Sequence, residues 1–158
     1  MIKIIAVGKL KERFFEDAAA EYSKRISAYS KIQIVQVPDE KAGENLSEKD
    51  AGIIKEKEAA AILKHIKPSE YVISLEIGGK RYSSEGFAGW LQDLAVSGKP
   101  DIVFVIGGSI GLGDSVIKRA DAHMSFSDLT FPHQLMRIIL LEQIYRAFKI
   151  IKKEPYHK

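Results

Sequence analysis

Four glycines fall within seven residues in the second half of the chain, in the segment Gly107-Gly108-Ser109-Ile110-Gly111-Leu112-Gly113. This segment follows the expected strand Asp101–Ile106, whose residues after Asp101 are all apolar, as is typical of a strand buried on both faces. In open α/β sheets, ligands bind beyond the carboxyl ends of strands, where glycines let backbone groups approach them closely. The segment therefore predicts a ligand site. The alternative is a loop that needs glycine only for positive φ angles.

The glycine spacing fits neither standard nucleotide-phosphate motif. A dinucleotide-binding fingerprint would follow the first strand with the pattern G-x-G-x-x-G, whereas this loop follows the fourth expected strand. A P-loop would end in Gly-Lys-Ser or Gly-Lys-Thr, which is absent here. The sequence therefore favours a neutral or cationic ligand, held by backbone carbonyls and apolar walls, over a phosphate.

A second candidate site lies at the head of the last expected helix, which runs from Pro132 to about Ile151. His133 and Arg137 are four residues apart and so share one face of this helix. The rest of that face is apolar and consists of Leu140, Ile144, Phe148 and Ile151. Polar groups at the head of such a face need partners, and a functional site is one reason for them. A histidine satisfied within the fold is the alternative for His133.

The last helix is apolar on most of its sides, which indicates the core on one side and a subunit interface on the other. From Pro132 to Lys158, six lysines and arginines stand against two glutamates, in a chain of net charge +3. Such a basic segment suits a polyanionic partner, or else a solvated helix end favoured by the helix dipole. The closing residues include Tyr156, whose ring can stack on a base, and His157, whose imidazole titrates near neutral pH. A frayed terminus is the alternative.

These residues are positioned by alternating strands and helices. The expected strands are Ile2–Val7, Ile32–Val37, Tyr71–Leu75, Asp101–Ile106 and Ala122–Phe126, and the expected helices are Lys11–Tyr29, Ser47 to about Ile66, one after Ser84 as N-cap, Asp114–Arg119 and Pro132 to Ile151. A turn at Gly78-Gly79-Lys80 is expected to close the third strand. The alternation predicts an α/β fold with a mostly parallel sheet and helices on both faces. Without repeats or low-complexity linkers, residues 1–158 are expected to form a single domain.

Composition excludes several classes of protein. With 46% hydrophobic and 28% charged residues, the chain reads as an ordinary globular protein. Its apolar runs, such as Ile138–Leu141, are too short to cross a membrane. There are no cysteines, and the four histidines form no ligand pair, so no metal site is expected. No signal peptide precedes the first strand, so a cytoplasmic location is expected.

Over its whole length, the sequence closely resembles the ribosomal RNA large subunit methyltransferase H family of the SPOUT superfamily. The resemblance rests on five motifs: Ile4-Ile5-Ala6-Val7-Gly8-Lys9, Phe104-Val105-Ile106-Gly107-Gly108, Leu129-Thr130-Phe131-Pro132-His133-Gln134 with Arg137, Tyr145-Arg146-Ala147, and Tyr156-His157-Lys158. It implies a homodimer with a C-terminal trefoil knot that binds S-adenosylmethionine (SAM). It also implies methylation of N3 of a pseudouridine in helix 69 of 23S ribosomal RNA, on the assembled ribosome.

The resemblance assigns site residues by position. The cofactor pocket would be formed by Leu75, Gly107 with the adjacent Gly108, and the stretch Phe126, Ser127, Asp128, Leu129, Thr130 and Phe131. The candidates for catalysis are His133, Arg137, Tyr156 and His157. Arg137 is suited to holding an anion, because a guanidinium does not deprotonate in proteins. His157 could be the base and Tyr156 could stack on the extruded nucleotide, with a partner subunit ordering the tail.

Two other functions remain open from the sequence alone. The first is an RNA-binding module that uses the basic helix and tail and has no need of SAM. The second is an α/β enzyme that acts on a small molecule at the glycine loop. A methyltransferase of this family must bind SAM, so a measurement of SAM binding distinguishes it from both alternatives.

Overall fold

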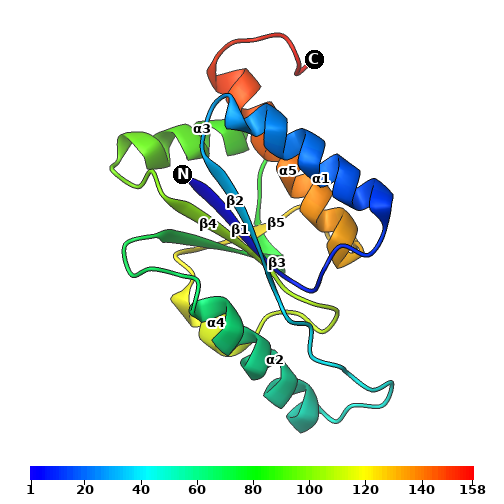
Figure 1. The fold of residues 1–158 in the computed structure, drawn as a ribbon. Helices are drawn as coiled ribbons and strands as arrows, with labels where there is room; N and C mark the ends of the chain where they lie inside the picture. Colours follow the sequence, from blue (N-terminus) through cyan, green and yellow to red (C-terminus); the bar gives the residue numbers. More distant parts are fainter.

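A computed structural model describes residues 1–158 and contains one sheet of five strands, all paired in parallel (Figure 1). The elements in chain order are β1 (Ile2–Val7), α1 (Arg13–Ser27), β2 (Ile32–Val37), α2 (Glu48–Leu63), β3 (Tyr71–Arg81), α3 (Ser84–Val96), β4 (Ile102–Ile106), α4 (Asp114–Arg119), β5 (Ala122–Ser125) and α5 (His133–Ile151). The strand order is β2-β1-β4-β3-β5. The predicted α/β class with a parallel sheet is confirmed.

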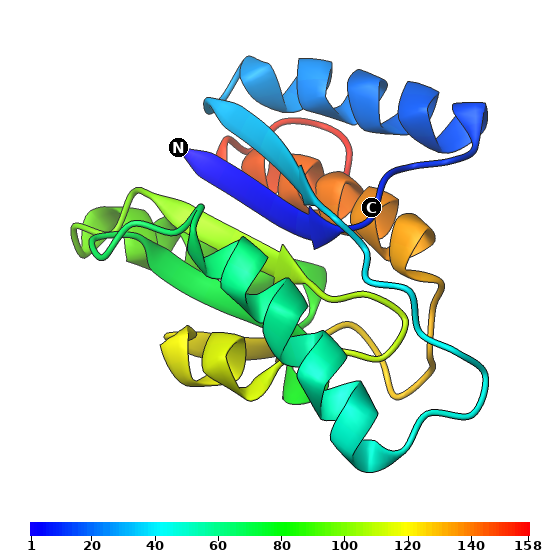
Figure 2. The same cartoon turned by 60° about the horizontal axis from the view of Figure 1, so that its bottom comes forward.

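Two layers of helices cover the sheet, as Figure 2 shows from a second direction. Helices α1, α3 and α5 pack on one face over a core that includes Phe87, Phe104 and Leu140. Helices α2 and α4 pack on the other face over a second core that includes Val105 and Val116. Because β1 and β4 lie inside the sheet between these layers, every residue of both strands is buried. This explains why their sequences read as continuous apolar runs.

A lysine interrupts the apolar run of β1. Lys3 is buried, and its Nζ donates to Glu70 Oε1 at 2.7 Å and to the carbonyl oxygen of His65 at 2.8 Å. Glu70 is also buried, so this charge pair is removed from water with its hydrogen bonds satisfied. The pair fastens β1 to the segment that leads into β3.

The third strand is longer than the sequence predicts. Instead of ending in a turn at Gly78-Gly79-Lys80, β3 continues to Arg81 with a register shift against β5 between Leu75 and Lys80. A Cβ on Gly79 would lie 2.5 Å from the backbone carbonyl carbon of Met124. The glycine therefore allows close approach of two strands here, and the predicted turn is wrong.

The helix starts also differ slightly from prediction. Ser47 caps α2 as expected, because its Oγ accepts from the Asp50 N–H at 3.1 Å. The N-cap of α3 is Ser83 rather than Ser84, since Ser83 Oγ accepts from the Gly86 N–H at 3.0 Å. Pro132 lies at the N-cap of α5, one position before the first helical residue.

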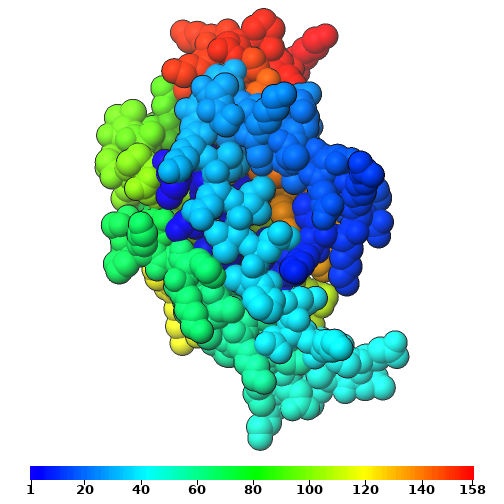
Figure 3. All heavy atoms as spheres, viewed as in Figure 1, coloured from blue at the N-terminus to red at the C-terminus, as the bar shows by residue number.

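The segment between β2 and α2, together with the start of α2, projects from the body of the molecule in the space-filling view (Figure 3). No helix of the structure combines the length and the apolar character needed to span a membrane. The trefoil knot implied by the resemblance concerns the threading of the chain around the β5–α5 connection, and it stays a prediction.

Candidate active site

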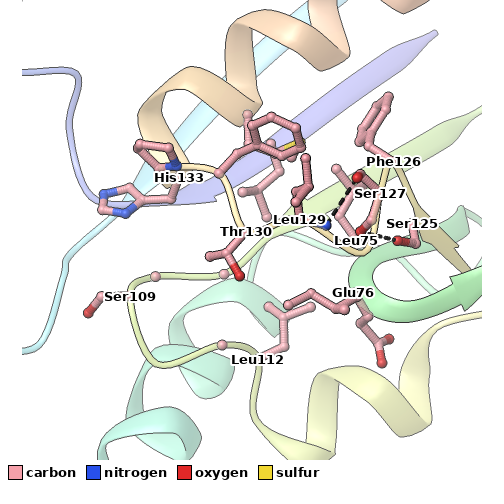
Figure 4. Close-up of a pocket in the computed structure, with 18 of the residues that line it drawn as sticks. Leu75, Glu76, Ser109, Leu112, Ser125, Phe126, Ser127, Leu129, Thr130 and His133 are labelled. Carbon is pink, nitrogen blue, oxygen red and sulfur yellow. Dashed lines mark hydrogen bonds between the residues drawn. The ribbon is translucent and has the colours of Figure 1, made fainter.

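A cavity of about 740 Å³ lies beyond the carboxyl end of β4 and beside the middle of β3 (Figure 4). This volume is within the range of small-molecule and cofactor sites. Its walls come from three separate segments of the chain: Leu75 to Ile77 at β3, Ile106 to Leu112 in the glycine loop, and residues between Met124 and Met136. The third segment runs from β5 across to α5. The cavity therefore lies where the sequence predicted a ligand site.

The residues assigned to the cofactor pocket meet in this cavity, with one exception. Its lining includes Leu75, Gly107, Gly108, Phe126, Ser127, Leu129, Thr130 and Phe131. Asp128 is not among the lining residues. Its side chain is 73% exposed, and its Oδ2 pairs with Nη1 of Arg81 at 2.7 Å. The side chain of Asp128 therefore links the loop to the end of β3 from outside the cavity lining, and its assignment to the cofactor pocket stays a prediction.

The glycine loop uses its glycines for two different reasons. A Cβ on Gly107 would lie 2.9 Å from the backbone carbonyl carbon of Gly111, closer than real Cβ contacts come. Gly111 has φ +90°, and its N–H donates to the Gly108 carbonyl at 3.1 Å. Close approach therefore requires glycine at position 107, and backbone conformation requires it at position 111. The sequence offered two explanations for these glycines, close backbone approach and positive φ angles, and each applies at a different position.

The loop between β5 and α5 is held by its own serines. Ser125 Oγ donates to the Ser127 carbonyl at 3.1 Å, and Ser127 Oγ accepts from the Leu129 N–H at 3.0 Å (Figure 4). Leu129 is 70% exposed, and Ile77, on the β3 side of the cavity, is 59% exposed. Two large apolar side chains thus lie at the cavity rim, where a bound ligand would remove them from water.

The cavity wall contains one carboxylate. Glu76 lines the cavity, and its Oε1 lies 2.7 Å from His123 Nδ1 and is also bonded to Ser74 Oγ. No lysine or arginine is among the lining residues. Such a wall suits an apolar or cationic ligand better than a phosphate, as the glycine spacing also suggested.

The head of α5 places its two polar residues differently. His133 lines the cavity. Arg137, one turn further, is fully buried and is not among the lining residues. Its Nη1 donates to Gln36 Oε1 at 3.0 Å and its Nη2 to the Gly8 carbonyl at 3.1 Å. Burial lowers the pKa of Arg137, and its Nε has no partner. Within one chain, Arg137 therefore fastens α5 to the end of β1.

The tail lies at the opposite end of α5. This helix has 19 residues and is therefore about 28 Å long, and in Figure 1 the C-terminus lies beyond its far end. Tyr156 Oη donates to Glu142 Oε1 at 3.1 Å, and His157 Nε2 lies 2.8 Å from Glu85 Oε1. Burial and the Glu142 carboxylate raise the pKa of Tyr156 to about 12. The tail is thus docked on its own chain rather than frayed, and it does not reach the cavity of that chain.

Sequence reasoning missed several lining residues. Ile77, Ile110, Leu112 and Met136 are ordinary apolar residues without a chemical signature, and Glu76 resembled any strand-end carboxylate. Their position just beyond strand ends or on the inner side of α5 was the available signal. No cluster of three or more potential metal ligands occurs in the structure.

A parallel α/β sheet with a glycine-lined cavity at its carboxyl edge defines a protein built to bind a small organic ligand. The family model described as predicted SPOUT methyltransferase matches residues 1–157. The chain therefore belongs to the SPOUT methyltransferase family, and the resemblance recognised in the sequence is confirmed.

Curated relatives match along nearly the whole chain. The ribosomal RNA large subunit methyltransferases H of Clostridium beijerinckii, Exiguobacterium sp. and Bacillus pumilus are 54%, 57% and 55% identical, and each alignment covers 99% of both chains. A Legionella pneumophila protein solved with bound SAM is similar in fold, with a TM-score of 0.50 and 12% identity over 92% of this chain and 66% of that one.

Proposed function

We propose that this protein transfers a methyl group from SAM to large-subunit ribosomal RNA. The substrate atom we propose is N3 of a pseudouridine in helix 69 of 23S ribosomal RNA, modified on the assembled ribosome in the cytoplasm. Support comes from full-length relatives whose names state ribosomal RNA large subunit methyltransferase activity. The observation that carries the proposal is the meeting, in one cavity, of the three segments that the family resemblance assigns to the cofactor.

The residues of the cavity fit SAM. When bound, SAM would supply an electrophilic methyl group on a positively charged sulfur. Leu75, Leu129 and Phe131 offer apolar surface to a heterocyclic base. The exposed backbone of Gly107 and Gly108 offers hydrogen-bonding groups without side chains in the way. The wall, which contains one carboxylate and no lysine or arginine, is compatible with a cationic ligand.

Methylation of an imide nitrogen requires removal of its proton. His133 lines the cavity, and a histidine can accept a proton near neutral pH. We propose that His133 lies beside the reacting nitrogen, and that Arg137 holds the head of α5 in place behind it. Positioning of both reactants supplies the rest of the catalysis, because methyl transfer is an in-line displacement.

We further propose that the active form is a homodimer in which the tail of one copy completes the cavity of the other. Tyr156 and His157 belong to the motif of the tail, yet they lie at the far end of α5 from the cavity of their own chain. Leu135 and Ile139 form a half-exposed apolar stripe on α5, one turn apart and outside the core cluster. A second copy packed along α5 would cover this stripe.

Isothermal titration calorimetry with SAM, followed by methylation assays on assembled ribosomes and on free 23S ribosomal RNA, tests the proposal. We expect binding of SAM, incorporation of a single methyl group, and its location at a helix 69 pseudouridine by mass mapping of nuclease fragments. Salt-dependent RNA binding without any affinity for SAM at millimolar concentration would favour the RNA-binding module instead. Light scattering that finds an active monomer at micromolar concentration would contradict the dimer.

A further inference from the structure

One buried carboxylate lies directly behind the glycine loop. Glu58 belongs to α2, yet only 3% of its surface is exposed. Its Oε1 accepts from the Glu40 N–H at 3.2 Å, whereas Oε2 is buried without a hydrogen-bond partner. A buried carboxylate oxygen without a donor costs free energy. The fold therefore keeps a group here that packing alone would not favour.

The carboxylate is directed at Gly108. A Cβ on that glycine would lie 3.4 Å from Glu58 Oε2 and 3.5 Å from Glu58 Oε1. Gly108 also lines the cavity. A single backbone residue without a side chain thus separates the two carboxylate oxygens of Glu58 from the space proposed for the cofactor.

The charged groups with the strongest effect on Glu58 are carboxylates, not cations. The charged groups that face it are the carboxylates of Asp39 and Glu40, both from the segment after β2. From β1 the side chain beside Gly108 is Val7, whose Cγ1 would lie 3.2 Å from a Cβ on that glycine. The pKa of Glu58 is raised to about 7. Burial is the main cause, and the Asp39 carboxylate contributes to the same shift. At neutral pH the group is therefore balanced between its neutral and its charged form.

We propose that Glu58 senses the charge of the bound cofactor through Gly108 and gives the pocket its preference for SAM over S-adenosylhomocysteine, the demethylated product. This inference rests on the proposed function. A positive sulfur in the cavity stabilises the ionised carboxylate, which loses its proton to water. After methyl transfer the sulfur is neutral, the stabilisation disappears, and Glu58 takes a proton back from water. The product is then held more weakly than the substrate form, which favours its release.

Glu58 does not line the cavity, so it acts through the field across Gly108 rather than by contact. A purely structural role for Glu58 predicts a different effect on ligand affinity. If the side chain only supported the loop, its replacement would weaken the binding of SAM and of S-adenosylhomocysteine equally, because the two ligands have the same shape apart from one methyl group.

The test compares the affinities of the two ligands by calorimetry at pH 8, where Glu58 is mostly ionised, for the unmodified protein, Glu58→Gln and Glu48→Gln. Glu48 is exposed on the same helix, so the control removes the same charge at the surface. For Glu58→Gln we expect about a tenfold loss of SAM affinity, because one favourable charge interaction in a partly shielded site is removed, and less than about a twofold change for S-adenosylhomocysteine. Sinefungin, which carries an amine in place of the methylated sulfur, is expected to follow SAM.

Equal losses for both ligands, or no loss for either, would overturn the inference. A second measurement needs no variant: SAM binding to the unmodified protein, repeated in buffers of different ionisation enthalpy, is expected to release protons near pH 6.5, and S-adenosylhomocysteine binding is not. The same proton release for both ligands would also overturn it. Failure of the unmodified protein to bind SAM would overturn the proposed function as well, whereas normal SAM binding with an unchanged ligand ratio in Glu58→Gln would overturn only this inference.

Discussion

The two ends of α5 differ in how completely their polar side chains are paired within the chain. At the head, His133 lines a cavity and the buried guanidinium of Arg137 has only two neutral acceptors and an unpartnered Nε. At the far end, Arg146 pairs with Glu142 at 2.6 Å and Lys149 pairs with Glu154 at 2.7 Å.

The tail is drawn into this second network. Tyr156 packs edge-on against Tyr145 with ring centroids 4.9 Å apart, and the Arg146 guanidinium lies 4.7 Å from the Tyr156 ring centroid. At the head, one buried polar atom has no partner within the chain and His133 faces the cavity, whereas the polar groups at the tail are satisfied within the chain. The head of α5 thus borders the cavity, whereas its far end holds the tail against the same chain.

The largest expected effect is a loss of methylation, without a loss of SAM binding, when the tail is removed. Deletion of Tyr156 to Lys158 should abolish methylation, because in the proposed dimer the tail completes the site of a second copy, and should leave SAM affinity and folding intact. Turnover on ribosomes, calorimetry with SAM and circular dichroism measure the three properties. Unchanged turnover would show that the tail is only an anchor.

A substitution in the glycine loop should abolish cofactor binding without changing the tail. Gly107→Ala should eliminate measurable SAM binding, because the new Cβ would lie 2.9 Å from backbone of Gly111 and must displace the loop. Gly89→Ala is the matched control, since a Cβ there has no atom within 4 Å. Calorimetry on both variants is the measurement, and retained affinity in Gly107→Ala would exclude the loop as the cofactor cradle.

A stability comparison sharpens the contrast between the two arginines of α5. Arg137→Ala should destabilise the fold by about 3 to 5 kcal/mol, since it leaves a cavity and removes the donor to the buried Gly8 carbonyl. Arg146→Ala should cost only about 1 kcal/mol, because its ion pair is partly exposed. Urea unfolding of both variants provides the values, and equal costs would mean that the two ends of α5 are equally anchored.

The smallest expected effect concerns the carboxylate behind the loop. The folded-state pKa of Glu58, about 7, lies above its ordinary value of 4.5, so its contribution to stability is fully present below pH 4.5 and is lost as the pH rises to 7. Glu58→Gln should therefore gain stability relative to the unmodified protein over this interval, reaching about 1 to 3 kcal/mol at pH 8. Thermal unfolding between pH 4 and pH 8 measures the gain. A constant difference across this range would show that Glu58 does not titrate there.

Much of the fold could be predicted because its signals are local. Continuous apolar runs such as Ile102–Ile106 mark strands buried on both faces, and Ser47 marks a helix start through a bond to a backbone group three residues away. The glycine loop and the motif at Leu129 to His133 could also be recognised, since each is contiguous in the sequence. The β3 extension could not, because it depends on how closely Gly79 approaches β5, more than 40 residues further along the chain.

By itself, the sequence determined the order of strands and helices, the position of the glycine loop and the family. Only the tertiary structure decided that Asp128 points away from the cavity while its neighbours line it, and that Arg137 is buried against Gly8. It also decided that Glu58, in a helix rich in lysine and glutamate, lies behind Gly108 rather than in water. The physical reason is that periodicity and capping report on neighbours within about one or two helical turns. The partners of these three side chains come from other elements, and only packing brings them together.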